Sequence, residues 1–184
     1  MYCVVFDISI GTKPLQRAKK LSVTSRTEIW YLFDFEGDTP QYIQRFNNVL
    51  NEMSQANKIG KDIIYKCGYS NLSFELWLIL HKINCNSHQL SPKGYLKFIN
   101  SSFGENFNNL SDFKKEKDYI RCLSKLQLSD MQVAIERAKK IQLSNKENGC
   151  QLRRNKDGKY TYYIENPSLD IWIAIKKILN ECGF

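Results

Sequence analysis

The chain lacks the features that would place it in a membrane or outside the cell. No uninterrupted apolar run in the sequence approaches the roughly 20 residues needed to cross a bilayer. Residues 1–6 are apolar, but no basic residue precedes them and Asp7 follows at once, which is typical of a strand and not of a signal peptide. We therefore expect a soluble, cytoplasmic protein.

The sequence also lacks the cysteine spacing of a zinc site. Its six cysteines are widely separated, and none of them forms the C-x-x-C pair that structural zinc requires. Reduced thiols in a cytoplasmic protein are the plain interpretation. These residues are Cys3, Cys67, Cys85, Cys122, Cys150 and Cys182.

Length and charge point to one globular domain with an acidic partner. A chain of 184 residues, 42% apolar and 25% charged, is of the size and composition of a single folded domain. We expect an α/β core over residues 1–83, followed by a helical part over residues 84–184. The net charge of +8 favours nucleic acid as a partner, without a preference for DNA or RNA.

Strands alternate with helices in the first half of the sequence. Residues 2–8, 28–33 and 62–69 are short apolar runs that predict strands, and residues 14–21 and 74–80 predict helices. Between the second and third runs, apolar residues recur at helical spacing from Ile43 to Met53. This order predicts an α/β fold with a mainly parallel sheet flanked by helices.

The second half carries helix-start and hairpin signals. Ser91-Pro92 and Asn166-Pro167 each place a capping side chain before a proline, which predicts two helix starts. Ser129 and Gln132 fit a capping box before another helix. Asp157-Gly158 predicts a β-hairpin over residues 151–164.

An acidic segment follows the second predicted strand and is a candidate metal site. Asp34, Glu36 and Asp38 lie where that strand ends, and ligands of open parallel sheets tend to bind at the carboxyl ends of strands. Carboxylates are suitable ligands for a partly hydrated Mg²⁺ beside phosphate. The alternative is that Asp and Gly are present because they favour a turn.

A second candidate site lies where the helix predicted from residue 74 begins. If Ser73 is the N-cap, Glu75 falls in the first turn, where the helix dipole stabilises an anion by about 0.3 to 1 kcal/mol. His81 and Asn71 lie close by in the sequence and are candidates for acid/base or phosphate contacts. The alternatives are that a lysine neutralises Glu75 and that His81 is a buried helix residue bonded to a carbonyl.

Basic residues gather in two places that suit nucleic acid. The first cluster is N-terminal, and the second surrounds Asp157-Gly158 with tyrosines beside it. Lysine and arginine neutralise phosphates, and aromatic faces stack bases for about 1 to 3 kcal/mol each. The second cluster is the better candidate, although exposed hairpins also alternate charged and aromatic residues for solubility. Its members are Arg153, Arg154, Lys156, Lys159, Tyr160, Tyr162 and Tyr163, and the first contains Lys13, Arg17, Lys19, Lys20 and Arg26.

Three segments give the chain a family resemblance. Residues 33–38 read Phe-Asp-Phe-Glu-Gly-Asp, and residues 70–81 read Ser-Asn-Leu-Ser-Phe-Glu-Leu-Trp-Leu-Ile-Leu-His. With Glu-Asn-Pro-Ser at residues 165–168, they resemble the RloB family, which is associated with prokaryotic defence and abortive infection. In the family pattern a proline stands where this chain has Leu72, and an aspartate stands where it has Glu36.

The resemblance implies a fold, an activity and a set of roles. It implies a Toprim-like sheet and a Mg²⁺-dependent (or Mn²⁺-dependent) nuclease-like effector of phage defence that works with an ATPase partner. It assigns the metal to Asp34, Glu36 and Glu75, and further catalytic or phosphate contacts to Glu75, His81 and Asn71. The family's N-terminal Glu-Gly-x-x-Thr-Glu segment does not occur here, which indicates an N-terminally shortened relative.

Two other functions are compatible with the same sequence. One is a catalytically inactive nucleic-acid-binding or regulatory subunit of a defence complex, which would keep the sheet and the basic surface without turnover. The other is a subunit that only binds proteins. Salt-sensitive nucleic-acid binding distinguishes the first from the second.

Overall fold

Four strands form the main sheet of the computed structural model, which describes residues 2–7 and 13–184. Their order is β1-β2-β3-β6. β1 (Tyr2–Asp7), β2 (Arg26–Asp34) and β3 (Ile63–Asn71) are parallel, and the two-residue β6 (Ser168–Leu169) runs antiparallel to β3. The α/β class is confirmed. Ile8, expected to end the first strand, lies outside the described residues.

The register of the sheet brings the candidate segments to one edge. β1 pairs with β2 only as far as Tyr31, so β2 continues beyond its β1 partner. On its other side β2 pairs with β3 to its end, where Asp34 lies opposite Ser70. Because β2 and β3 are parallel, the acidic segment after β2 and the segment leading to α3 leave the sheet at the same edge.

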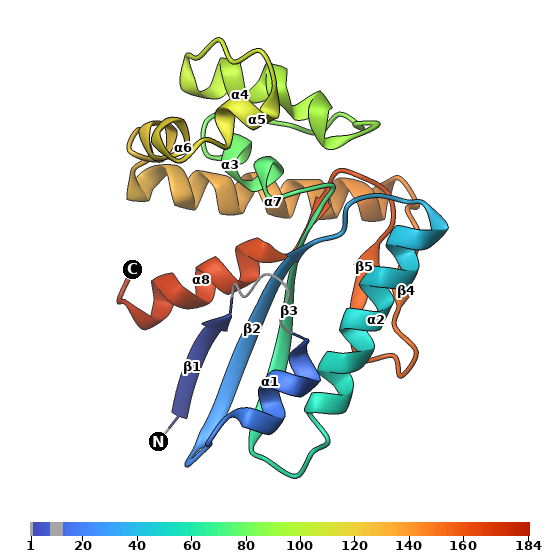
Figure 1. The fold of residues 1–184 in the computed structure, drawn as a ribbon. Helices are drawn as coiled ribbons and strands as arrows, with labels where there is room; N and C mark the ends of the chain where they lie inside the picture. Colours follow the sequence, from blue (N-terminus) through green and yellow to red (C-terminus); the bar gives the residue numbers. More distant parts are fainter. Residues whose placement is uncertain (1, 8–12) are drawn as a thin grey trace.

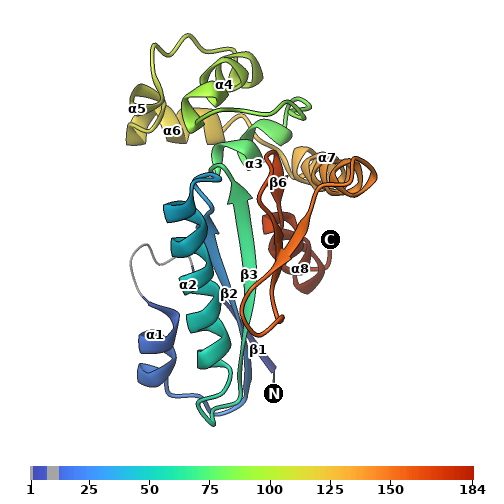
Figure 2. The same ribbon diagram turned by 90° about the vertical axis from the view of Figure 1, so that its right-hand side faces the viewer.

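Helices cover both faces of the sheet. α1 (Pro14–Lys20) and α2 (Pro40–Ala56) pack on one face, and α8 (Ile171–Glu181) lies on the other (Figures 1 and 2). α2 begins where its sequence predicts: the Thr39 hydroxyl accepts a hydrogen bond from the Tyr42 N–H at 3.4 Å, and Pro40 takes the first helical position. The turn before it includes Gly37 with φ +137°, a conformation that favours glycine.

A helical layer caps the edge of the sheet at which β2 and β3 end (Figure 1). It consists of α3 (Glu75–Leu80), the 3₁₀ helix η1 (Pro92–Tyr95), α4 (Leu96–Phe103), α5 (Leu110–Phe113), α6 (Glu116–Leu123) and α7 (Leu128–Glu147). All six residues of α3 are buried, so this short helix lies at the centre of the layer's apolar core. None of the described helices is long and apolar enough to pass through a bilayer.

The predicted hairpin is present and lies beside α2 (Figure 1), to which Tyr162 is joined by a hydrogen bond from Asn47. β4 (Leu152–Arg154) pairs antiparallel with β5 (Thr161–Tyr163), and the connecting turn contains Asp157 and Gly158. Asn155 closes the turn, because its N–H donates to the Tyr160 carbonyl at 3.0 Å. The hairpin thereby brings a basic turn next to the C-terminal half of α2.

Two helix starts differ from the predictions. Ser73 is not the N-cap of α3: Phe74 takes that position, and the helix begins at Glu75. The capping box of α7 joins Gln127 and Asp130, not the predicted Ser129 and Gln132. The Ser73 hydroxyl has no hydrogen-bond partner among the described residues and so caps no helix, whereas the Gln127 N–H donates to the Asp130 carboxylate at 2.9 Å.

The two proline signals also have different outcomes. After Ser91, Pro92 opens a 3₁₀ helix that continues directly into α4, as a helix-start signal should. After Asn166, by contrast, Pro167 leads into β6, and α8 begins only at Ile171. The Asn166 side chain instead accepts a hydrogen bond from the Gln89 N–H at 2.7 Å, which ties the segment to the loop before η1.

Candidate functional site

A large cavity opens at the carboxyl end of β2. Its volume is about 1160 Å³, and its walls come from β2, α2, the end of β3 and residues of α6 and α8. Asp34, Glu36 and Ser70 line it, so the acidic segment and the start of the 70–81 motif face the same space. The cavity is mainly apolar elsewhere, with several aromatic side chains in its walls.

Asp34 is the most perturbed carboxyl in this cavity. Its side chain is open to the cavity but enclosed by protein on its other sides, and this desolvation is the main reason why its pKa rises to about 7. The negative charge of Glu75 raises the pKa further, whereas Lys114 and a hydrogen bond from the Phe74 N–H lower it. Asp34 and Glu75 are therefore close enough to interact, although 41 positions separate them.

Glu75 lies behind Asp34 and is neutralised by a lysine. Its side chain is only 6% exposed, and its Oε1 atom lies 2.8 Å from the Nζ of Lys114, at the end of α5. The Lys114 side chain is 55% exposed, so it reaches inward from the surface. A buried carboxylate needs a counter-charge because desolvation is expensive. The arrangement matches the alternative in which a lysine pairs with Glu75.

Glu36 points toward a different partner. Its Oε2 atom accepts a hydrogen bond from Arg45 of α2 at 2.8 Å, and both side chains are exposed. Its charge still contributes to the raised pKa of Asp34, so Glu36 lies near Asp34 although its carboxylate is paired with Arg45. Asp38 is exposed at the surface. Of the three predicted metal ligands, the structure thus brings Asp34 and Glu75 together and leaves Glu36 at their margin.

The donor atoms fit a partly hydrated divalent cation and not a closed metal centre. Within the part of the chain that the structure describes, no three His, Cys, Asp or Glu residues are grouped so that they could hold a metal. Mg²⁺, however, is commonly held by one or two carboxylates together with waters and substrate phosphates. Asp34 and Glu75 can supply those carboxylates. Ser70 is paired with Asp34 in the sheet, and its buried hydroxyl has no hydrogen-bond partner among the described residues.

Asn71 and His81 lie in the protein interior. Asn71 is fully buried and its Nδ2 donates to the Ile164 carbonyl at 2.6 Å, which joins the end of β3 to the chain leaving the hairpin. His81 is 4% exposed, its Nδ1 donates to the Trp77 carbonyl at 2.9 Å, and burial lowers its pKa. Neither residue is among the described residues that line the cavity. For His81 this is the arrangement that the non-catalytic alternative describes.

The hairpin presents its basic residues but not the tyrosine predicted to stack on bases. Arg153, Arg154, Lys156 and Lys159 are exposed. Tyr162 is 3% exposed: its hydroxyl accepts a hydrogen bond from Asn47 at 2.8 Å, and its ring packs against Phe46 of α2 and Phe35, which follows β2. The structure therefore corrects its assignment, because a ring inside the core cannot stack on a base. Tyr160 is likewise buried.

Two contributors to the site were not found from the sequence. Lys114 directly follows a four-residue helix that no periodic pattern marks, and a lysine among many others carries no signal of its own. The Phe74 N–H that bonds Asp34 is a backbone group, which only the fold can place. The position of Asp34 at the end of a buried strand did predict that it faces a cavity.

Comparison with known proteins identifies the family. The RloB-like protein family model matches residues 8–178, which include the acidic segment, the 70–81 motif and the hairpin. Searches of curated proteins and of solved structures gave no significant match. The matched region covers most of the chain, and the chain therefore belongs to the RloB-like protein family.

Proposed function

We propose that this RloB-like protein is a Mg²⁺-dependent (or Mn²⁺-dependent) nuclease-like effector of phage defence that cleaves phosphodiesters in DNA or RNA. The observation that carries the proposal is the proximity of two carboxyl groups at the end of a parallel strand: Asp34 lines the cavity, and the charge of the buried Glu75 acts on it. A Toprim-like arrangement of the three parallel strands is part of the proposal, as is an ATPase partner.

The proposed roles follow from the positions of the side chains. Asp34 and Glu75 hold the cation, and Glu36 can approach it only after releasing Arg45. A bound divalent cation would supply charge stabilisation to the phosphate and lower the pKa of a bound water. Lys114 neutralises Glu75 and lies near enough to Asp34 to lower its pKa, so its ammonium group can also meet a phosphate oxygen.

Asn71 and His81 enter the proposal as positioning residues. Both are buried and donate hydrogen bonds to backbone carbonyls, in the segment that also carries Glu75. Asn71 anchors the end of β3, next to Ser70, and His81 anchors the end of α3. Their replacement would move Glu75 relative to Asp34, so the loss of rate would follow from geometry and not from a missing acid or base.

Metal-dependent cleavage tests this function directly. Labelled single-stranded and duplex DNA and RNA are incubated with the protein in Mg²⁺, Mn²⁺ or EDTA. We expect cleavage with a divalent cation, none in EDTA, and loss of cleavage in Glu75→Gln. Glu147→Gln, an exposed change on α7, is the matched control and keeps the wild-type rate. Cleavage that survives EDTA or Glu75→Gln contradicts the proposal.

A second candidate function is a catalytically inactive nucleic-acid-binding or regulatory subunit. It is favoured by the Lys114–Glu75 ion pair, which already satisfies one carboxylate, and by the missing group of three metal ligands among the described residues. It predicts salt-sensitive binding of nucleic acid without cleavage under any metal condition. The assay above therefore separates the two functions, provided that binding is measured on the same samples.

A further inference from the structure

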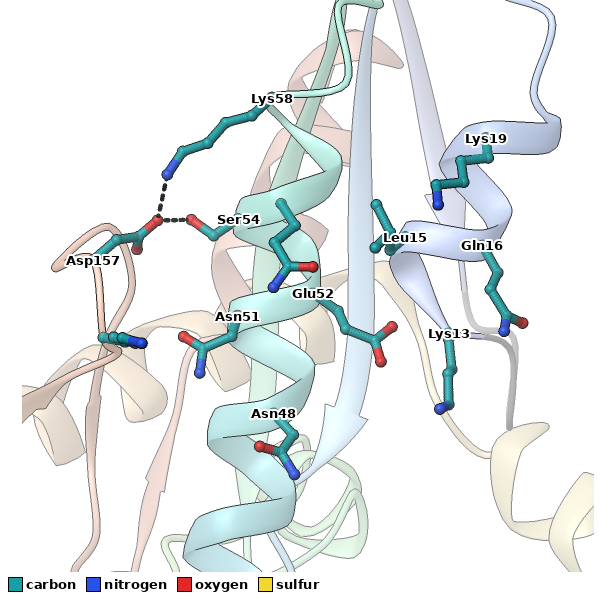
Figure 3. Close-up of a pocket in the computed structure, with 12 residues that line it drawn as sticks. Lys13, Leu15, Gln16, Lys19, Asn48, Asn51, Glu52, Ser54, Lys58 and Asp157 are labelled. Carbon is teal, nitrogen blue, oxygen red and sulfur yellow. Dashed lines mark hydrogen bonds and ion pairs between the residues drawn. The ribbon is translucent and has the colours of Figure 1, made fainter.

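A second hollow lies over the outer face of α2, and neither Asp34 nor Glu75 lines it. Its volume is about 870 Å³. As Figure 3 shows, α2 forms its floor, α1 lies on one side, and the hairpin turn with Asp157 lies on the other. We call this hollow the trough. Its floor is rich in amides, with Asn48, Asn51 and Gln55 along α2, and these groups can donate hydrogen bonds to phosphate and sugar oxygens.

The charges of the trough favour an anion. Lys13, Lys19 and Lys156 line it and are exposed, and none of them has an ion pair with any residue that the structure describes. Of its two carboxylates, Asp157 is already committed, because it accepts hydrogen bonds from Ser54 and Lys58. These bonds hold the pKa of Asp157 well below its usual range. Only Glu52 opposes the three lysines.

The trough joins the cavity that contains Asp34. Lys13, Asn48 and Glu52 line both hollows, so the wall is continuous from the hairpin turn to the end of β2. The character of the lining changes along this path. Lysines and amides dominate the trough, whereas aromatic side chains such as Tyr42, Phe74 and Tyr119 line the cavity. Tyr42 is 39% exposed, and Phe74 and Tyr119 are partly exposed.

We propose that single-stranded nucleic acid binds along the trough, with its phosphates on Lys13, Lys19 and Lys156, and continues past Asn48 into the cavity. The inference rests on the proposed function, whose cavity the strand would enter. It adds the route that the nucleic acid takes over the surface, which includes lysines from both basic clusters. It also specifies a single strand and not a duplex. A double helix is too wide to enter a cavity of about 1160 Å³, whereas an unpaired base fits beside its aromatic walls.

Binding of a labelled 20-nucleotide single strand, measured by fluorescence anisotropy without metal at several salt concentrations, tests the path. The triple variant Lys13→Gln, Lys19→Gln, Lys156→Gln should bind at least tenfold more weakly than wild type at low salt. The slope of log affinity against log salt should fall by about 2, since each phosphate contact on a single strand contributes about 0.7. Duplex of the same sequence should bind more weakly than the single strand.

A matched control removes the same charge elsewhere. Lys93→Gln, Lys140→Gln, Lys176→Gln replaces three exposed lysines on η1, α7 and α8, outside the lining of both hollows. This variant should stay within about twofold of wild type apart from the effect of net charge. Equal losses in the two triple variants, or equal affinity of wild type for single strand and duplex, overturn the path.

A single substitution tests the junction between the two hollows. Asn48 is exposed on α2, so Asn48→Glu places a negative charge on the path without disturbing the core. We expect at least fivefold weaker single-strand binding, while Gln132→Glu, an exposed change on α7, has no effect. Unchanged binding in Asn48→Glu contradicts the passage into the cavity.

Hydrolysis of a small phosphodiester, bis(p-nitrophenyl) phosphate, separates the path from the enzymatic proposal. This compound is small enough to enter the cavity beside Asp34 without contacts in the trough. If wild type binds single strands through the three lysines but hydrolyses no phosphodiester, the proposed binding path is supported and the proposed nuclease activity is wrong. If the triple variant retains hydrolysis of the small compound and loses cleavage of the oligonucleotide, both stand. If oligonucleotide cleavage persists unchanged in the triple variant, the proposed binding path is wrong and the proposed nuclease activity is supported.

Discussion

Two aspartates, Asp34 and Asp170, share a raised pKa of about 7 but lie in different surroundings. Asp34 ends β2 and faces the large cavity, where burial, Glu75 and Lys114 all affect its pKa. Asp170 precedes α8, where burial raises its pKa and only a hydrogen bond from Gln142 lowers it. Burial is the main cause of both raised pKa values, but at Asp34 neighbouring charges also act on the carboxyl, whereas at Asp170 they do not.

The difference shows why a perturbed pKa does not by itself identify a functional residue. Asp170 has a structural explanation: its N–H donates to the Tyr69 carbonyl at 2.8 Å, and its side chain accepts a hydrogen bond from Gln142 of α7. It therefore joins β3, α7 and α8. The Asp34 carboxyl joins no such set of elements among the described residues: it accepts a hydrogen bond from the Phe74 N–H and faces the cavity.

The largest expected difference between the two aspartates is in catalysis. Asp34→Asn should lower the rate of metal-dependent cleavage at least 100-fold, because it removes a ligand charge from the proposed cation site. Asp170→Asn, the matched control, should keep the rate within about twofold. Single-turnover cleavage of a labelled oligonucleotide measures both. Equal losses in the two variants would break the comparison.

The next largest expected effect is on the pH dependence of the free energy of unfolding, and it comes from Asp170. Its folded pKa of about 7 lies above the ordinary value of 3.8, so its contribution to stability is lost as the pH rises through this interval. The full shift corresponds to about 4 kcal/mol, and partial hydration should reduce it to about 2 kcal/mol. Asp170→Asn should therefore stabilise the protein by about 2 kcal/mol at pH 8 and hardly at pH 4.

Urea unfolding of wild type and Asp170→Asn at both pH values measures this difference. Asparagine keeps the oxygen that accepts the Gln142 hydrogen bond, so the comparison isolates the charge. Any pH dependence that comes from Asp34 is common to both proteins and cancels. A variant that is less stable than wild type at pH 8 would show that the charge of Asp170 is compensated.

The sequence predicted the placement of residues that depends on strands and missed the placement that depends on packing. The proximity of Asp34 and Glu75 could be predicted because the end of a buried strand and a strand-to-helix motif mark them. Lys114 follows a short helix without periodicity, and β6 has only two residues. Tyr162 was misassigned although Thr161 is exposed and Tyr162 buried, as period-2 alternation in a strand allows. Which face of the hairpin packs inward depends on its contacts with α2.

The ion pair of Glu75 should have a moderate effect on stability. Lys114→Met leaves a carboxylate that is 6% exposed without its counter-charge. Breaking a buried pair costs about 3 to 5 kcal/mol, but the lysine is half exposed and water can partly replace it, so we expect about 1 to 2 kcal/mol. Urea unfolding at pH 7.5 measures the loss. The double variant Lys114→Met, Glu75→Gln should regain most of it, and additive losses would contradict the pairing.

The smallest expected effect is at Gln142. Gln142→Leu removes the side-chain donor to Asp170, so it should raise the pKa of Asp170 further and lower stability by about 1 kcal/mol at pH 8. The loss should shrink at pH 5, where Asp170 is protonated in the folded protein. Cleavage should be unaffected because the residue lies outside the Asp34 cavity walls. A pH-independent loss would assign the effect to packing.

Titration with Mn²⁺, followed by calorimetry, tests most directly whether Asp34 and Glu75 share one cation. The account predicts one site in wild type, at least tenfold weaker affinity in Asp34→Asn and in Glu75→Gln, and a double variant little weaker than either. Wild-type affinity in Glu75→Gln, or no Mn²⁺ binding by wild type, would contradict it.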